Sequence, residues 1–182
     1  MVLNIVLAPL VFCATAWVRR RQAAVLRSGI ALTDEQQNLA RAVGVNAVER
    51  VRVVAARVVP LPLPLWACSA AQRAGWLSPH IAGMTLGYGI VLRADCFNPE
   101  YCDQRLLAHE LSHVAQYERL GGVHGFLRQY VRECVWPGYP RGALEIEAQA
   151  AEARGSVPQA DVIPYASAAN SRTARSECAV DV

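Results

Sequence analysis

The stretch from about Asp103 to Leu120 constrains the fold of this chain more than any other, because it predicts a long helix that must be buried. Gly121 and Gly122 follow it and are typical residues at the end of a helix. Its apolar residues occupy several faces, namely Leu106, Leu107, Leu111, Val114 and Ala115. A helix that is apolar on most of its circumference needs other elements packed around it. We therefore expect it to be a core element.

The rest of the chain supplies elements that could cover this helix. The 182 residues are 53% hydrophobic and 18% charged, which fits one folded domain with a core of its own. Helices are predicted at 33–44, 123–134 and 143–154, and strands at 49–59 and 84–93. The sequence therefore predicts an α+β fold in which a small sheet packs against the 103–120 helix and a further helix follows.

The central helix carries the motif "HELSH". His109 and His113 are four residues apart, so on a helix both imidazoles leave the same face and can meet one metal ion. Glu110 lies one step round the helix, within reach of a water molecule on that ion. This is the arrangement that metal-assisted hydrolysis needs, because the metal lowers the pKa of the water and a carboxylate accepts its proton.

Two histidines leave the metal one protein ligand short, since a catalytic zinc takes three and keeps one open position. Arg119 stands six residues beyond His113, where a metzincin would have its third histidine. His124 could swing back from the start of the next helix. The other candidates are acidic residues of the 143–154 helix, Glu145, Glu147 and Glu152, of which Glu145 and Glu152 share one face.

With "LLAHELSHVAQYE", a preceding "AGMTLGYGIVLR" and a following "GYPRGALEIEAQA", the chain resembles small bacterial zincin-like proteins of the HExxH gluzincin type. The resemblance covers roughly Val51 to Arg154 and implies one Zn²⁺ per chain. In related zincins the third ligand is the first glutamate of an E-x-x-A-[DN] pattern, which implies Glu145, with Glu147 as the alternate. Gln149 departs from that pattern and weakens an expected contact behind the ligands.

Other residues are expected around this centre. Tyr130 and Tyr139 lie between the two ligand helices, and either hydroxyl could stabilise the transition state, although packing roles are open to both. The strand predicted at 84–93 is punctuated by glycines and is suited to pairing with an extended peptide. The residues expected to hold the substrate backbone are Gly87, Tyr88, Gly89 and Ile90.

The N-terminus leaves two alternatives. Residues 2–18 are almost entirely apolar, Pro9 interrupts them, and Arg19, Arg20 and Arg21 follow at once. The segment is either a membrane anchor, with the remaining chain on the cytoplasmic side of the inner membrane, or a hydrophobic element packed on the domain. We accordingly divide the chain into an apolar segment at 1–30, a zincin-like domain at 31–155 and a disordered tail at 156–182.

Composition narrows the partners. Six cysteines form no CxxC pair, which favours reduced thiols in the cytoplasm. The arginines are mostly scattered, which argues against a nucleic-acid surface. The favoured hypothesis is a zinc-dependent metallopeptidase that acts on peptides or proteins. The alternative is a catalytically silent zincin-like domain that binds a metal or a partner.

Overall fold

The protein is described by a computed structural model in which residues 2–62, 70, 73, 81–95, 97–98, 101–102 and 104–154 are placed. The predicted tail at 156–182 lies outside these residues. The elements in chain order are α1 (Val2–Ser28), β1 (Ile30–Ala31), α2 (Asp34–Ala42), the 3-10 helix η1 (Val48–Arg50), β2 (Arg52–Ala56), β3 (Gly83–Leu86), β4 (Gly89–Arg93), β5 (Phe97–Asn98), β6 (Tyr101–Cys102), α4 (Gln104–Arg119), α5 (Val123–Glu133), the π-helical turn η2 (Cys134–Gly138) and α6 (Ala143–Arg154).

Four of the strands form one mixed sheet in the order β1-β2-β4-β3, and β5 pairs with β6. The central strand β4 runs parallel to β2 and antiparallel to β3. The protein has two hydrophobic cores. Ile90 and Leu92 face the first core, which lies between the sheet and α4, and Val91 faces the second core, which lies between the sheet and α1. A strand buried on both faces in this way reads as a continuous apolar run, as "GIVLR" does.

The strand predicted at 84–93 is wrong as a single element. The structure divides it into β3 and β4, which are joined by a tight turn at Gly87 and Tyr88. Gly87 has φ +66°, a left-handed conformation that glycine adopts without strain, and a Cβ there would collide with the Gln22 side chain. The glycines therefore mark a hairpin turn rather than a place along one strand.

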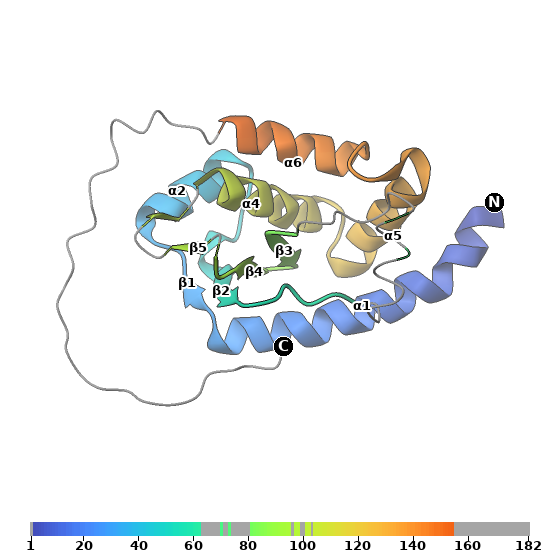
Figure 1. Ribbon diagram of the computed structural model, residues 1–182, viewed down its shortest axis with the longest axis horizontal. Coiled ribbons are helices and arrows are strands. Elements are labelled where there is room, and N and C mark those ends of the chain that lie inside the picture. The colour runs from blue at the N-terminus through green and yellow to red at the C-terminus, as the bar shows by residue number, and fades with distance from the viewer. Residues whose placement is uncertain are drawn as a thin grey trace.

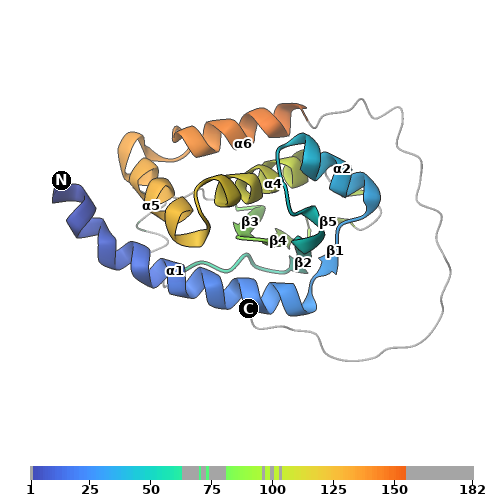
Figure 2. The same ribbon diagram turned by 180° about the vertical axis from the view of Figure 1, so that it is seen from behind.

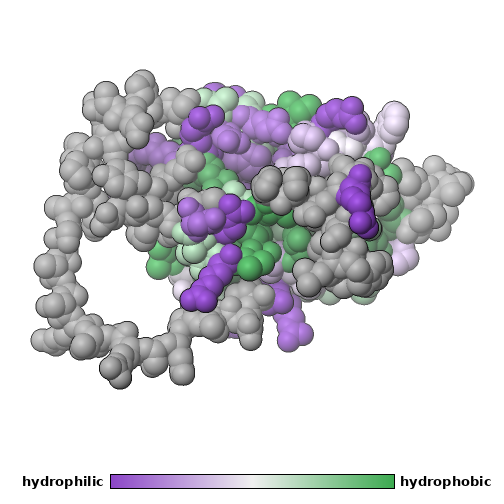
Figure 3. Space-filling view, viewed as in Figure 1, coloured by the Kyte–Doolittle hydropathy of each residue, from purple (hydrophilic) through white to green (hydrophobic). Residues whose placement is uncertain are grey.

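The elements stack in layers (Figures 1 and 2). Helix α1 crosses one face of the sheet, α4 covers the other face, and α6 lies on the side of α4 away from the sheet. Figure 3 shows hydrophilic residues gathered along α6 and hydrophobic ones beneath it, over β3 and β4. The prediction of an α+β fold, with a small sheet on the HExxH helix and a second helix bearing the third ligand candidate, is confirmed.

Helix α2 begins at an N-cap that the sequence predicts. The Thr33 hydroxyl accepts a hydrogen bond from the Gln36 amide, and the Gln36 side chain accepts one from the Thr33 amide. This reciprocal capping satisfies two amides at the helix start. Helix α2 then packs against α4 and helps to close the first core.

Helix α1 spans most of the segment predicted at 1–30 and packs along the domain. Val11, Val18 and Val25 recur every seven residues and are buried in the second core, against the sheet and α5. Among the described residues, no helix is sufficiently long and apolar to cross a membrane. Cys13 and Cys134 are free thiols, and the cytoplasmic location stays a prediction.

Candidate metal centre

Helix α4 supplies both histidines from one face. The rings of His109 and His113 lie with their centroids 5.0 Å apart and nearly perpendicular to each other. The helix beneath them is rigidly held, because Leu107, Leu111 and Val114 are fully buried on its opposite side. A spacing of four residues on a buried helix is therefore enough to bring the two imidazoles together.

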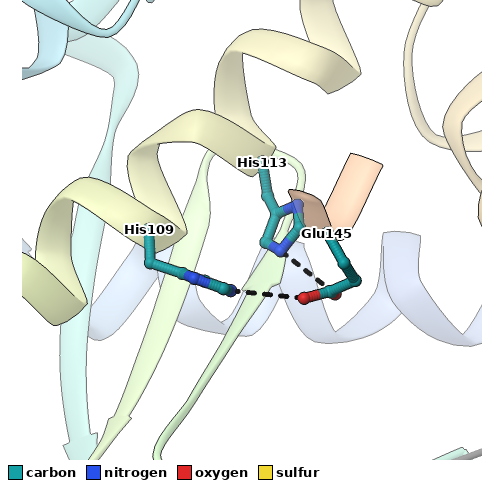
Figure 4. Close-up of side chains that lie close together, drawn as sticks. All are labelled: His109, His113 and Glu145. Atoms are coloured by element: carbon teal, nitrogen blue, oxygen red, sulfur yellow. Dashed lines mark ion pairs between the residues drawn. The ribbon is translucent and has the colours of Figure 1, made fainter. Parts of the chain in front are cut away.

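Helix α6 delivers Glu145 to the same point (Figure 4). Its Oε2 lies 3.6 Å from Nε2 of His109, and its Oε1 lies 3.5 Å from Nε2 of His113. Ligand atoms of the three residues all lie within 4.8 Å of one another. The edge of a tetrahedral zinc site built from nitrogen and oxygen ligands is about 3.3 to 3.5 Å long. The three side chains thus lie close enough together to share one metal ion.

Glu145 also carries an unpaired atom. Its side chain is 5% exposed, and Oε2 is the buried side-chain atom that lacks a hydrogen-bond partner within the described part of the chain. A buried carboxylate oxygen without a partner costs free energy unless a cation or a donor meets it. His109, His113 and Glu145 therefore fit a divalent metal with nitrogen and oxygen ligands, as Zn²⁺ is.

Each imidazole is oriented from behind through its Nδ1 atom. Nδ1 of His113 lies 2.8 Å from Oε1 of the fully buried Gln116. The Gln116 amide nitrogen donates to the carbonyl of Leu144, so its oxygen must accept from His113. Nδ1 of His109 lies 3.2 Å from Oε2 of Glu152. Both contacts place the proton on Nδ1 and leave Nε2 free to bind a metal.

The sequence analysis did not predict that Gln116 orients His113, and it considered Glu152 only as a possible metal ligand. The signal for Gln116 was present, since a glutamine three residues after His113 on an apolar helix must be buried with its amide satisfied. The structure places Glu152 behind His109, where it supplies the carboxylate contact that Gln149 cannot.

Tyr130 is tied to the third ligand candidate. Its hydroxyl donates a 2.7 Å hydrogen bond to Oε1 of Glu145, and burial together with the nearby Glu145 charge raises the pKa of Tyr130 well above its ordinary value. Burial and the Glu145 charge also raise the pKa of Tyr139 to about 12. Both phenols stay protonated at neutral pH, and Tyr130 orients the carboxylate. The predicted transition-state role of either tyrosine stays a prediction.

Glu110 points toward β3 and is 4% exposed. The Thr85 hydroxyl lies 2.7 Å from Oε2 of Glu110 and 2.9 Å from its backbone carbonyl. A Cβ at Gly83 would lie 2.5 Å from Oε1 of Glu110, so only glycine leaves room for this carboxylate. Burial raises the pKa of Glu110, and the charges of His113 and His109 oppose that rise without cancelling it. A raised pKa suits a carboxylate that must accept a proton.

The metal-free centre behaves as an ion pair. Burial lowers the pKa of His113, but the hydrogen bond and charge of Glu145 and the charge of Glu110 outweigh it and raise the pKa. Burial raises the pKa of Glu145, whereas His113, Tyr130 and His109 lower it further than burial raises it. A metal ion bound here would therefore compete with a proton for His113, and its affinity should fall as the pH falls.

The alternate ligand candidates lie elsewhere. Glu147 pairs with Arg119 through two hydrogen bonds of 2.7 and 2.8 Å and also accepts from Gln116. His124 has Nδ1 3.4 Å from the Thr15 hydroxyl on α1. Neither belongs to the group of residues that could share a metal ion, whereas Glu145 does.

The four residues predicted to hold a substrate do not line the metal centre. Gly89 and Ile90 belong to β4, whose two edges are both occupied by β2 and β3. Gly87 and Tyr88 line a separate cavity of about 550 Å³ that is formed with α1, α4 and the start of α5. Gly89 and Ile90 therefore have no free strand edge for a peptide, and Gly87 and Tyr88 lie in the turn between β3 and β4. The substrate role of these four residues stays a prediction.

A family model described as the eCIS core domain matches residues 31–121. The matched segment runs from the end of β1 through α4 and so contains His109, Glu110 and His113. It ends before α5 and α6, and Glu145 lies outside it. No curated protein and no solved structure matches the chain.

Proposed function

The chain belongs to the eCIS core domain family, and we propose that this member is a zinc-dependent metallopeptidase of gluzincin type. The observation that carries the proposal is the convergence of His109, His113 and Glu145 beside a buried Glu110. The family match names no peptidase, so the proposal stands on the chemistry of these side chains.

Each residue of the site has a separate role in the proposed hydrolysis. His109, His113 and Glu145 would hold one Zn²⁺, which when bound supplies a Lewis acid that polarises a peptide carbonyl and acidifies water. Glu110, with its raised pKa, accepts the proton of the attacking water and returns it to the departing amine. Thr85 and Gly83 fix the carboxylate of Glu110 through a hydrogen bond and a steric limit.

The edge strand β3 is the place where a peptide would pair. Within the described residues β3 is the last strand of the sheet: β4 pairs with one of its edges, and no strand pairs with the other edge. The Arg93 amide donates to the Ala82 carbonyl, so the antiparallel alternation turns the backbone groups of Gly83 and Thr85 away from β4. The Tyr117 hydroxyl contacts the Thr85 carbonyl from that side. A peptide added there lies beside Glu110, so we propose Gly83–Leu86 as the substrate strand.

A second candidate is a metal-binding domain without turnover. The hollow that Glu145 lines with Tyr130 and Tyr139 encloses essentially no free volume within the described part of the chain. Pockets that enclose ligands usually measure about 300 to 1,000 Å³. The lack of room on this side of Glu145 favours an ion over a peptide as the ligand.

The first test combines metal analysis with one substitution. The purified protein should carry about one zinc per chain by elemental mass spectrometry. Glu110→Gln should keep that zinc and lower cleavage of a quenched-fluorescent peptide library by about a hundredfold to ten thousandfold. His124→Ala is the matched control and should keep both properties, since His124 lies outside the cluster.

Each outcome has a meaning. A parent protein that takes up no zinc contradicts both candidates. Zinc without cleavage favours the binding domain, and equal cleavage by the parent and by Glu110→Gln assigns the activity to a contaminant.

A further inference from the structure

Helix α1 has a packed face and an open face. Val11, Val18 and Val25 are buried, and Thr15 lies on the same side with 7% exposure. The opposite side of the helix is open, and its apolar residues include Leu10 at 46% exposure and Phe12 at 71%. Because the packed face is held by the sheet and α5, only the open face is available to another surface.

The open face changes character along its length. Helical spacing places Pro9, Phe12, Cys13 and Ala16 on one outward stripe, followed on the same stripe by Arg20 and Arg27. Arg19 is exposed at its side. Helix α1 contains no acidic residue. The stripe therefore runs from exposed apolar side chains to exposed cations with no negative charge between them.

We propose that this open face of α1 binds the surface of an anionic lipid bilayer. Phe12 and Arg20 are eight residues apart, or about 12 Å along a helix. If the helix lies slightly tilted on the bilayer, the Phe12 ring can enter the acyl boundary, about 5 to 10 Å deep, while the Arg20 guanidinium stays at the lipid phosphates. Trp17 is half-buried against the second core at the side of this face, and the Arg21 guanidinium lies 5.6 Å from its ring.

Charge complementarity selects lipid over a neutral partner. Arginines near an anionic bilayer attract its phosphates, and the apolar stripe needs no shaped groove because acyl chains adapt to it. The layer order places α6 on the side of the molecule away from α1 (Figures 1 and 2). A protein bound through α1 would therefore hold the metal centre, between α4 and α6, away from the bilayer.

The test is sedimentation of the full chain with vesicles. One set contains phosphatidylcholine alone, and the other contains phosphatidylcholine and phosphatidylglycerol at about two to one. We expect binding to the anionic set that weakens as salt is added. The double variant Arg20→Gln with Arg27→Gln should bind about thirtyfold more weakly, since each arginine contributes about 1 kcal/mol near such a surface. Phe12→Ser should bind about tenfold more weakly.

Matched variants on the far layer separate this face from net charge and general stickiness. Arg141→Gln with Arg154→Gln removes the same charge from exposed residues at and before α6, and Ile146→Ser removes an apolar side chain that is 54% exposed there. Both should bind like the parent. Circular dichroism checks folding, which the exposed Phe12 position should leave intact.

Three results would overturn the proposal. These are no binding to the anionic vesicles, equal binding to both vesicle sets, or a loss of binding in Arg141→Gln with Arg154→Gln that equals the loss in Arg20→Gln with Arg27→Gln. A dimer that Phe12→Ser dissociates in analytical ultracentrifugation, without vesicle binding, assigns the face to a second copy instead. None of these readouts depends on zinc or on cleavage, so they are independent of the proposed peptidase.

Discussion

Helices α4 and α6 build the two halves of the proposed metal centre by different means. In α4 the residues His109, Glu110 and His113 are placed by their own spacing on a helix that the core holds on its other faces. In α6, Glu145 arrives from 32 residues beyond His113 and depends on contacts between elements. The half on α4 is therefore fixed by local sequence spacing, and we call it the local half. The half on α6 is fixed by tertiary contacts, and we call it the tertiary half.

Helix α6 packs extensively on α4, and specific polar contacts add to that packing. The Gln116 amide donates to the Leu144 carbonyl, and Tyr130 donates to Glu145. Glu133 accepts from the Leu144 amide and caps the start of α6. Leu144 itself is 1% exposed in the second core. The position of the third ligand candidate is thus set by side chains of α4 and α5, whereas α4 alone brings the two histidines onto one face.

The largest expected effect comes from removing the tertiary ligand. Glu145→Ala should weaken zinc binding on the order of a hundredfold to a thousandfold, because a binding free energy of about 10 to 16 kcal/mol is shared among the ligands of such a site. Glu147→Ala should weaken it less than about tenfold, since Glu147 touches Gln116 and Arg119 rather than the metal position. Competition with a zinc chelator at fixed pH measures both. A larger loss in Glu147→Ala would assign the third ligand to Glu147.

Much of the local half could be predicted from the sequence. The apolar faces of α4, the HExxH spacing and the capping box at Thr33 are each determined within a turn or two of helix, so pattern alone suffices. Glu145 was predicted through its place in "EIEAQ" and a family resemblance, with Glu147 open. The structure distinguishes the two by showing Glu147 paired with Arg119.

The tertiary half could not be predicted in the same way. The split of 84–93 into two strands follows from the left-handed turn at Gly87, where the Gln22 side chain of α1 also approaches from a distant part of the sequence. The role of Gln116 depends on a carbonyl of α6, and the role of Tyr130 on the path of α5. Sequence periodicity reports which face of an element is buried, but not which partner buries it.

Gln116 connects the two halves of the site, because it contacts His113 on α4 and the Leu144 carbonyl on α6. Its replacement tests that connection. Gln116→Met keeps the volume but removes both the acceptor for His113 and the donor to Leu144, so zinc affinity should fall about tenfold to a hundredfold. Glu152→Ala, behind His109, should cost less because the Glu152 side chain is 38% exposed and water can replace it. Chelator competition reports the two losses. Equal losses would mean that burial and the hydrogen bond to Leu144 give Gln116 no greater hold on its imidazole than the more exposed Glu152 has.

The smallest effect should come from Glu118 near the far end of α4, whose hydrogen bonds within the described part of the chain lead to residues outside α6. Glu118 accepts hydrogen bonds from the Asn46 and Ala47 amides and from the Tyr88 hydroxyl. Burial raises the pKa of Glu118, but these donors lower it further, so the folded pKa lies below that of the unfolded chain. The stabilisation is therefore present above the unfolded pKa and lost as the pH falls through the folded pKa.

Glu118→Gln should accordingly lower the free energy of unfolding by less than about 1 kcal/mol at neutral pH, because the group is largely solvated. The difference from the parent should shrink as the pH falls below about 4. Urea unfolding of both proteins across that range measures it. Zinc affinity at neutral pH should stay unchanged, since Glu118 lies outside the metal cluster. A change in zinc affinity would show that the C-terminal end of α4 and the metal centre are coupled, and that the local half is less independent than its spacing implies.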